Sequence, residues 1–70
     1  MKYYIVKKNS QFGTTEYKRY KCTDGFSRNK ELCWRFSKQG AIKIIERLKD
    51  EYRINVERGY ITFELEEAEV

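Results

Sequence analysis

The chain has 70 residues, with 15 Lys and Arg against 11 Asp and Glu, a net charge of +4, 16% aromatic residues and no His. A chain of this length fits one domain with a small core, which leaves little room for a deep ligand pocket or a buried catalytic group. The absence of His removes the commonest general base and metal ligand, and the four glycines do not cluster into a phosphate-binding loop. We therefore expect a single domain over residues 1–70 that binds rather than catalyses, without a cofactor, metal or small-molecule substrate.

The first predicted element is a strand over residues 2–8. Apolar side chains alternate onto both faces, with Tyr3 and Ile5 on one face and Tyr4 and Val6 on the other. A strand that is apolar on both faces is typical of a central position, or of one covered on both sides.

Two further strands are predicted before the helix, over residues 14–23 and 31–36, each next to a turn that contains Gly. In the later strand Leu32, Trp34 and Phe36 alternate with polar or small residues, which is the pattern of a half-buried strand. We expect Trp34 and Phe36 to face the core.

One long helix is predicted over residues 38–52, because apolar residues recur at three- and four-residue spacing. Ser37 is the expected N-cap, since its hydroxyl can accept a hydrogen bond from a backbone N–H of the first turn. The apolar stripe consists of Ala41, Ile44, Ile45, Leu48 and Tyr52.

The chain after the helix is less regular. Residues 53–57 fit either a short strand or a connection, whereas residues 60–66 alternate as a strand with Ile61, Phe63 and Leu65 facing inward. Residues 66–70 are acidic, and we expect a frayed tail.

The predicted order is β-β-β-α-β. It indicates an α+β fold in which an antiparallel sheet carries one amphipathic helix on one face, in two layers. We expect Trp34, Phe36, Ile61 and Phe63 to meet the apolar stripe of the helix.

The two cysteines, Cys22 and Cys33, lie on successive predicted strands. Two reduced thiols are the favoured interpretation, and a disulfide is possible only if the strand register brings the pair face to face. The first residues do not have the pattern of a signal peptide, and no stretch approaches the ~20 apolar residues of a membrane-spanning helix. We expect a soluble, cytoplasmic protein without membrane contact.

The charge is unevenly distributed. Residues 1–35 hold nine Lys or Arg against three acids, whereas residues 36–70 hold six against eight. This asymmetry favours a basic surface on the first strands, which could bind phosphates through counterion release and bases through aromatic stacking. The alternative is that these residues form the ordinary polar, solvent-facing side of an antiparallel sheet, with lysines that keep edge strands from aggregating. The candidate nucleic-acid-binding residues are Lys7, Lys8, Tyr17, Lys18, Arg19, Lys21, Arg28, Lys30 and Arg35.

Three strands followed by a helix that starts with Trp34-x-Phe36-Ser37-x-x-x-Ala41 resemble two groups of DNA-binding domains. One is the plant ethylene-response-factor domain, and the other is the amino-terminal arm-binding domain of phage-type integrases. The resemblance, over residues 3–52, implies that the sheet enters the major groove and that the helix packs behind it.

The same resemblance gives the groove-facing role to Arg19, Lys21 and Arg35, together on the face of the sheet that the helix does not cover. The chain departs from the pattern in two places, since a strand follows the helix and residues 3–6 are apolar where the plant domain has an Arg-rich strand. The stretch from Asp24 to Lys30, with the Trp and Phe that follow, is also similar to small proteins of bacteriophages and prophages. That similarity implies a phage or prophage origin.

A protein-binding role is the alternative function. The acidic end could imitate nucleic acid and block a host or defence enzyme, with exposed Tyr4, Tyr17 and Tyr60 as anchors. A homodimer joined through the second apolar face of the first strand is a further alternative.

Overall fold

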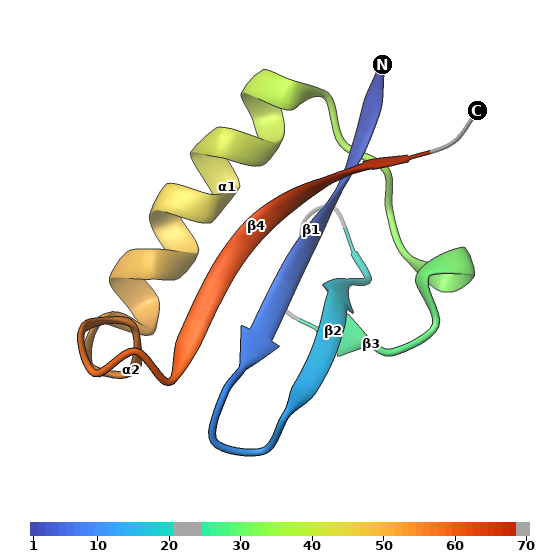
Figure 1. The fold of residues 1–70 in the computed structure, drawn as a ribbon. Coiled ribbons are helices and arrows are strands. Elements are labelled where there is room, and N and C mark those ends of the chain that lie inside the picture. The colour runs from blue at the N-terminus through green and yellow to red at the C-terminus, as the bar shows by residue number, and fades with distance from the viewer. Residues whose placement is uncertain (21–24, 69–70) are drawn as a thin grey trace.

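The computed structural model describes residues 1–20 and 25–68. The four strands form one antiparallel sheet in the order β3-β2-β1-β4, and the long helix packs on one face of it (Figure 1). This arrangement confirms the two-layer α+β fold predicted from the sequence. The elements in chain order are β1 (Lys2–Asn9), β2 (Thr14–Lys18), β3 (Phe26–Ser27), the 3₁₀ helix η1 (Lys30–Leu32), α1 (Lys38–Glu51), α2 (Arg53–Glu57) and β4 (Ile61–Ala68).

Strand β1 is central, as its two apolar faces predict. It pairs with β2 on one side, where Val6 lies opposite Tyr17, and with β4 along its whole length on the other, where Ile5 lies opposite Leu65. Both faces of β1 are buried, because Ile5 packs under α1 and Tyr4 packs on the opposite side of the sheet.

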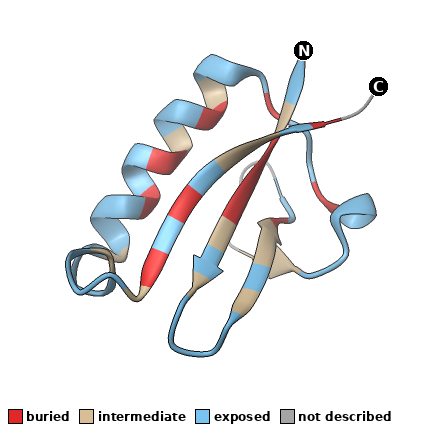
Figure 2. Ribbon diagram, in the orientation of Figure 1, coloured by how far each residue is buried: buried red, intermediate tan, exposed pale blue. Residues whose placement is uncertain are grey.

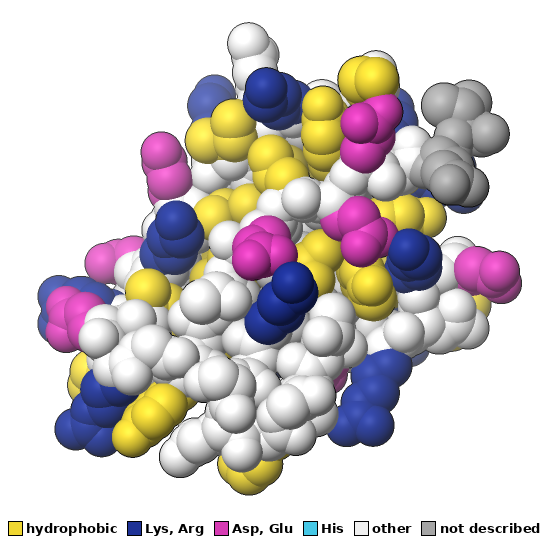
Figure 3. Space-filling view, viewed as in Figure 1, with side chains coloured by type: hydrophobic (Ala, Val, Ile, Leu, Met, Phe, Trp, Pro, Cys, Tyr) yellow, Lys and Arg dark blue, Asp and Glu magenta, His cyan; other side chains and the backbone are white. Residues whose placement is uncertain are grey.

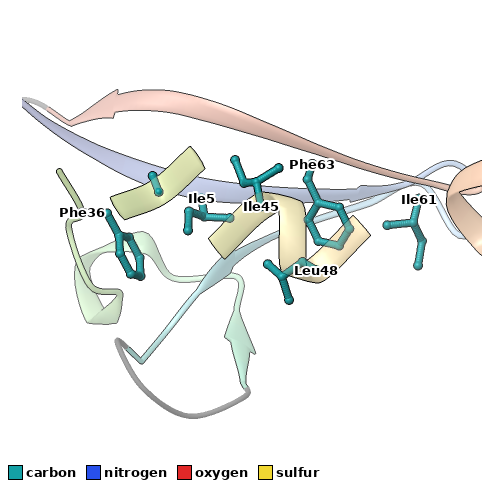
Figure 4. Close-up of a cluster of buried hydrophobic side chains, with 7 residues drawn as sticks. Ile5, Phe36, Ile45, Leu48, Ile61 and Phe63 are labelled. Atoms are coloured by element: carbon teal, nitrogen blue, oxygen red, sulfur yellow. The ribbon is translucent and has the colours of Figure 1, made fainter. Parts of the chain in front are cut away.

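The main core lies between the sheet and α1 (Figure 4). The apolar stripe of the helix turns inward as its spacing predicts, and buried residues alternate with exposed ones along β4 (Figure 2). Ser37 caps the helix, since its Oγ accepts a hydrogen bond from the Gly40 backbone N–H at 3.2 Å. The core consists of Ile5, Phe36, Ala41, Ile45, Leu48, Ile61 and Phe63.

A smaller cluster covers the other face of β1. Tyr4, Cys33 and Ala68 are buried together, and the Tyr17 ring meets the Tyr4 ring edge-on at 5.9 Å. Tyr4 is only 8% exposed and Val6 only 2%. The expectation that this face is free to join two copies, or that Tyr4 is an exposed anchor, is therefore wrong.

The third predicted strand has the wrong position. Residues 31–36 form part of η1 and an extended connection, with a single bridge between Phe36 and Tyr3, and the third strand is the short β3. The reason is local, because Ser27 Oγ accepts from the Asn29 N–H and Asn29 Oδ1 accepts from the Glu31 N–H, both at 3.1 Å. These two bonds stabilise a turn in place of a strand.

The predicted burial of Trp34 is wrong for the same reason. Trp34 was expected in the core, yet it is 48% exposed, whereas Phe36 is buried at 4%. The second strand ends at Lys18 instead of continuing to residue 23, and Cys22, with its possible disulfide to Cys33, lies outside the described residues.

The end of the chain is more ordered than predicted. Residues 53–57 form α2, and β4 continues through Ala68, which pairs with Lys2 and is buried. Residues 66–68 therefore belong to the sheet and are no frayed tail. Within the described residues, none of the helices combines the length and the apolar character needed to cross a membrane.

Candidate nucleic-acid interface

The face of the sheet opposite α1, here called the open face, carries both signs of charge. The strand pairing places Lys8 of β1 opposite Thr62 of β4, two residues from Glu64 on the same face, and Tyr4 opposite Glu66. Lys8 Nζ lies 3.0 Å from a Glu64 carboxylate oxygen, and Lys30 Nζ, from η1, lies 2.7 Å from Glu66. Figure 3 shows acidic and basic side chains intermixed on this side of the molecule.

These ion pairs favour the charged form of the two lysines. The hydrogen bond to Glu64 raises the pKa of Lys8, and the hydrogen bond to Glu66 raises the pKa of Lys30. Lys30 also lies over the rings of Tyr4 and Tyr17, at 5.8 and 5.6 Å from their centres. The positive charges of Lys8 and Lys30 are therefore already balanced by neighbouring carboxylates.

Two further candidates, Lys7 and Lys18, lie on the face of the sheet that α1 covers. Lys7 pairs with Glu16 at 3.4 Å, and its ammonium stands 4.3 Å from the centre of the Phe26 ring. Lys18 is 1% exposed, and its Nζ lies 5.7 Å from the centre of the same ring. A buried ammonium cannot reach a phosphate, so the assignment of Lys18 to a nucleic-acid surface is wrong.

Arg19 and Arg35 do not share a strand, and they come from two segments whose backbones lie side by side. Arg35 lies in the connection between η1 and α1, and the Trp34 backbone N–H donates to the Arg19 carbonyl at 3.1 Å. The Arg19 guanidinium carbon lies 5.1 Å from the centre of the Tyr20 ring, and Tyr20 is 44% exposed. We call this surface, formed by Lys2, Arg19, Tyr20, Trp34 and Arg35, the Trp34 end.

Shallow hollows mark the same surface. One of about 300 Å³ and another of about 420 Å³ are both lined by Lys2, Trp34 and Arg35. Burial raises the pKa of the Cys33 thiol below this surface, and the positive charge of nearby Arg19 acts in the opposite direction. Among the described residues, no acid forms an ion pair with Lys2, Arg19 or Arg35.

Two of the predicted residues remain. Arg28 is exposed in the connection between β3 and η1, and Lys21 lies outside the described residues. The predicted group of Arg19, Lys21 and Arg35 on one open sheet face is therefore not what the described residues form, because Arg35 is not in the sheet.

Sequence reasoning missed Lys2, Tyr20 and Trp34 as surface residues. Trp34 was assigned to the core because its alternation with Phe36 imitates a strand. The turn residues Ser27 and Asn29, two positions apart and just before Glu31, are the signal that could have corrected this, since such side chains favour local hydrogen bonds over strand pairing.

Comparison with models of protein families, with curated proteins and with solved structures found no match. The resemblance to DNA-binding domains and to phage proteins therefore stays a prediction. Within residues 1–20 and 25–68, no three His, Cys, Asp or Glu side chains gather closely enough to hold a metal ion.

Proposed function

We propose that the chain binds nucleic acid, and that it does so through the Trp34 end and not through the middle of the open face. The observation that carries the proposal is the contrast in charge balance between the two surfaces. Lys8 and Lys30 each have a carboxylate within 3.0 Å, whereas Arg19 and Arg35 are exposed and have no acidic partner among the described residues.

The chemistry of the Trp34 end suits a nucleic-acid strand. An exposed guanidinium group can bind two phosphate oxygens at once, and it releases counterions from the phosphate backbone. Trp34 and Tyr20 offer exposed aromatic surface on which unpaired bases can stack, and the Arg19 guanidinium already lies beside Tyr20. This combination favours single-stranded nucleic acid, since bases inside a duplex have no free ring face.

A matched pair of double variants tests the proposal. Arg19→Ala with Arg35→Ala removes two positive charges from the Trp34 end, and Lys8→Ala with Lys30→Ala removes two from the open face. Affinity for a fluorescent single-stranded oligonucleotide is measured by anisotropy from about 50 to about 200 mM salt, because each lost phosphate contact lowers the salt slope by about one.

We expect the arginine variant to bind more weakly, with a salt slope lower by about two, and the lysine variant to keep most of its affinity. Equal losses in the two variants would move the site back to the open face. Absence of binding at low salt, or binding that ignores salt, would refute the function itself.

Trp34→Ala tests the stacking part. Removal of one stacked ring costs about 1–3 kcal/mol, so affinity for a single strand should fall roughly tenfold or more. Trp34→Phe keeps an aromatic ring and should retain most of the affinity. If both variants bind like the original chain, the ring does not stack on bases.

A further inference from the structure

Strand β4 forms one edge of the sheet, and the direction of its backbone groups follows from hydrogen bonds elsewhere. Tyr3 exchanges two hydrogen bonds with Phe36, at 2.8 and 2.7 Å, on the side of β1 away from β4. The N–H and C=O of one strand residue point to the same side, and the side alternates along the strand. Tyr4 and Val6 therefore point toward β4.

The register carries this alternation into β4. Tyr4 lies opposite Glu66 and Val6 opposite Glu64, so the backbone groups of these two glutamates are used by β1. The backbone groups of Phe63, Leu65 and Glu67 consequently point outward. Among the described residues no strand lies beyond this edge (Figure 1). The hydrogen bond from the Ser10 N–H to the Tyr60 carbonyl, at 2.8 Å, agrees with the same alternation.

Such an edge is a template for another strand, and its side chains limit which strand fits. Glu64 and Glu66 stand on the open face along the edge, with side chains 53% and 39% exposed. In an antiparallel pair with a second copy, a register centred on Leu65 puts Glu64 opposite Glu66, and one centred on Glu64 puts the two Glu64 residues opposite each other. Like charges directly opposite are destabilising, so the edge disfavours a second copy.

We propose that the β4 edge binds an extended segment of a partner protein that carries Lys or Arg at alternate positions. The basic side chains would face Glu64 and Glu66, whose carboxylates each have acceptor sites left beside the lysine already bound. Phe63, Leu65 and Glu67 would supply the backbone hydrogen bonds. The chain as a whole carries +4, so its net charge would repel a basic segment. The attraction must therefore come from the acidic residues along the edge.

The probe is a synthetic peptide that alternates Lys and Val, with a control in which Glu replaces each Lys. Amide hydrogen exchange is followed by NMR with and without each peptide. The basic peptide should slow exchange at Phe63, Leu65 and Glu67, and leave Glu64 and Glu66 unchanged because β1 already protects them. No slowing, or equal slowing by the acidic peptide, would overturn the proposal.

A backbone variant separates strand addition from simple attraction. Glu67→Pro removes one outward N–H at a position where an edge strand tolerates proline, and Glu67→Ala removes the same carboxylate but keeps the N–H. Circular dichroism checks that both variants fold. The proline variant should lose peptide binding and the alanine variant should keep it; the reverse order would refute strand addition.

Two further experiments test the charge argument and the occupation of the edge by a second copy. Glu64→Gln with Glu66→Gln keeps every backbone group and should weaken binding of the basic peptide, and unchanged binding would refute the charge argument even if Glu67→Pro does not fold. Protection of the outward amides that rises with protein concentration alone would show that a second copy occupies the edge, against the proposal. Neither result touches the nucleic-acid proposal, because the Trp34 end and the β4 edge share no residue.

Discussion

The open face and the Trp34 end are both rich in lysine or arginine, yet within the described part of the chain only the open face forms ion pairs. On the open face Lys8 and Lys30 bond to Glu64 and Glu66, which come from the far end of the sequence. At the Trp34 end, Arg19 and Arg35 have no acidic partner among the described residues.

The difference lies in what the sheet brings next to each group. Strand β4 runs antiparallel to β1 along its full length, so an acidic segment is placed directly beside a basic one. The Trp34 end lies where the chain leaves the sheet, and there the Trp34 backbone N–H donates to the Arg19 carbonyl. A count of charges along the sequence cannot distinguish these two situations.

The largest expected effect concerns two aromatic residues that are two positions apart. Phe36→Ala should lower the free energy of unfolding by about 3–5 kcal/mol, because Phe36 is buried in the main core. Trp34→Ala should cost about 1 kcal/mol or less, since Trp34 is half exposed. Urea unfolding followed by circular dichroism measures both, because the chain holds a single Trp and fluorescence would be lost in one variant. Similar losses would mean that Trp34 supports the core after all.

A second pair of neighbours sharpens the comparison, since Lys18 is buried and Arg19 is exposed. Lys18→Ala should destabilise the fold by about 1–3 kcal/mol, because Lys18 is buried and lies opposite Phe26 in the β2–β3 pair. Arg19→Ala should stay within about 0.5 kcal/mol in stability but weaken binding of an oligonucleotide. Thermal unfolding ranks the two variants by stability, and anisotropy on the same samples ranks them by affinity for the oligonucleotide. Weaker binding by a folded Lys18→Ala variant at low temperature would contradict the exclusion of Lys18 from the nucleic-acid surface.

Ser37 tests whether stability and binding separate at the Trp34 end, because it caps α1 three residues after Trp34. Ser37→Ala should lower stability by about 1 kcal/mol, since the Gly40 N–H loses its acceptor. Ser37→Asn, which keeps a capping oxygen, is the control and should be close to neutral. Affinity for an oligonucleotide should be unchanged in both variants where they are folded. A loss of affinity in the alanine variant alone would show that the capped turn itself shapes the interface.

The sequence predicted those features that depend on periodicity. The helix stripe and the central β1 with two apolar faces follow from spacing, the Ser37 cap follows from its hydroxyl at the helix start, and all three are found. The third strand failed because residues 31–36 alternate like a strand, while Ser27 and Asn29 hold the preceding turn by side-chain bonds. Local hydrogen bonds therefore outweighed an apolar alternation.

The candidate site was less predictable, because a charged residue's role depends on contacts between distant segments. Lys30 and Glu66 are far apart in sequence, yet their charged groups lie 2.7 Å apart in the fold. The residues around either one do not predict this ion pair. The burial of Lys18 likewise depends on Phe26, which β3 places beside it.

The smallest expected effect is a pH dependence that belongs to the open face. The ion pairs raise the pKa of Lys8 and Lys30 above 10.5, the value taken for an unperturbed lysine. A group whose pKa is raised in the folded state stabilises it fully below the unfolded pKa, and this contribution is lost as the pH rises through the folded pKa. The double variant Lys8→Gln with Lys30→Gln should therefore differ from the original chain at neutral pH and converge with it above about pH 10.5.

The two proteins differ only at these two positions, so the difference between their unfolding curves reports on the lysines. Both lysines are exposed, so the difference should be small and should shrink further when salt screens the pairs. A difference that persists unchanged above that pH would mean that the lysine stems, and not their charges, stabilise the open face. In that case charge balance would no longer explain why this face differs from the Trp34 end.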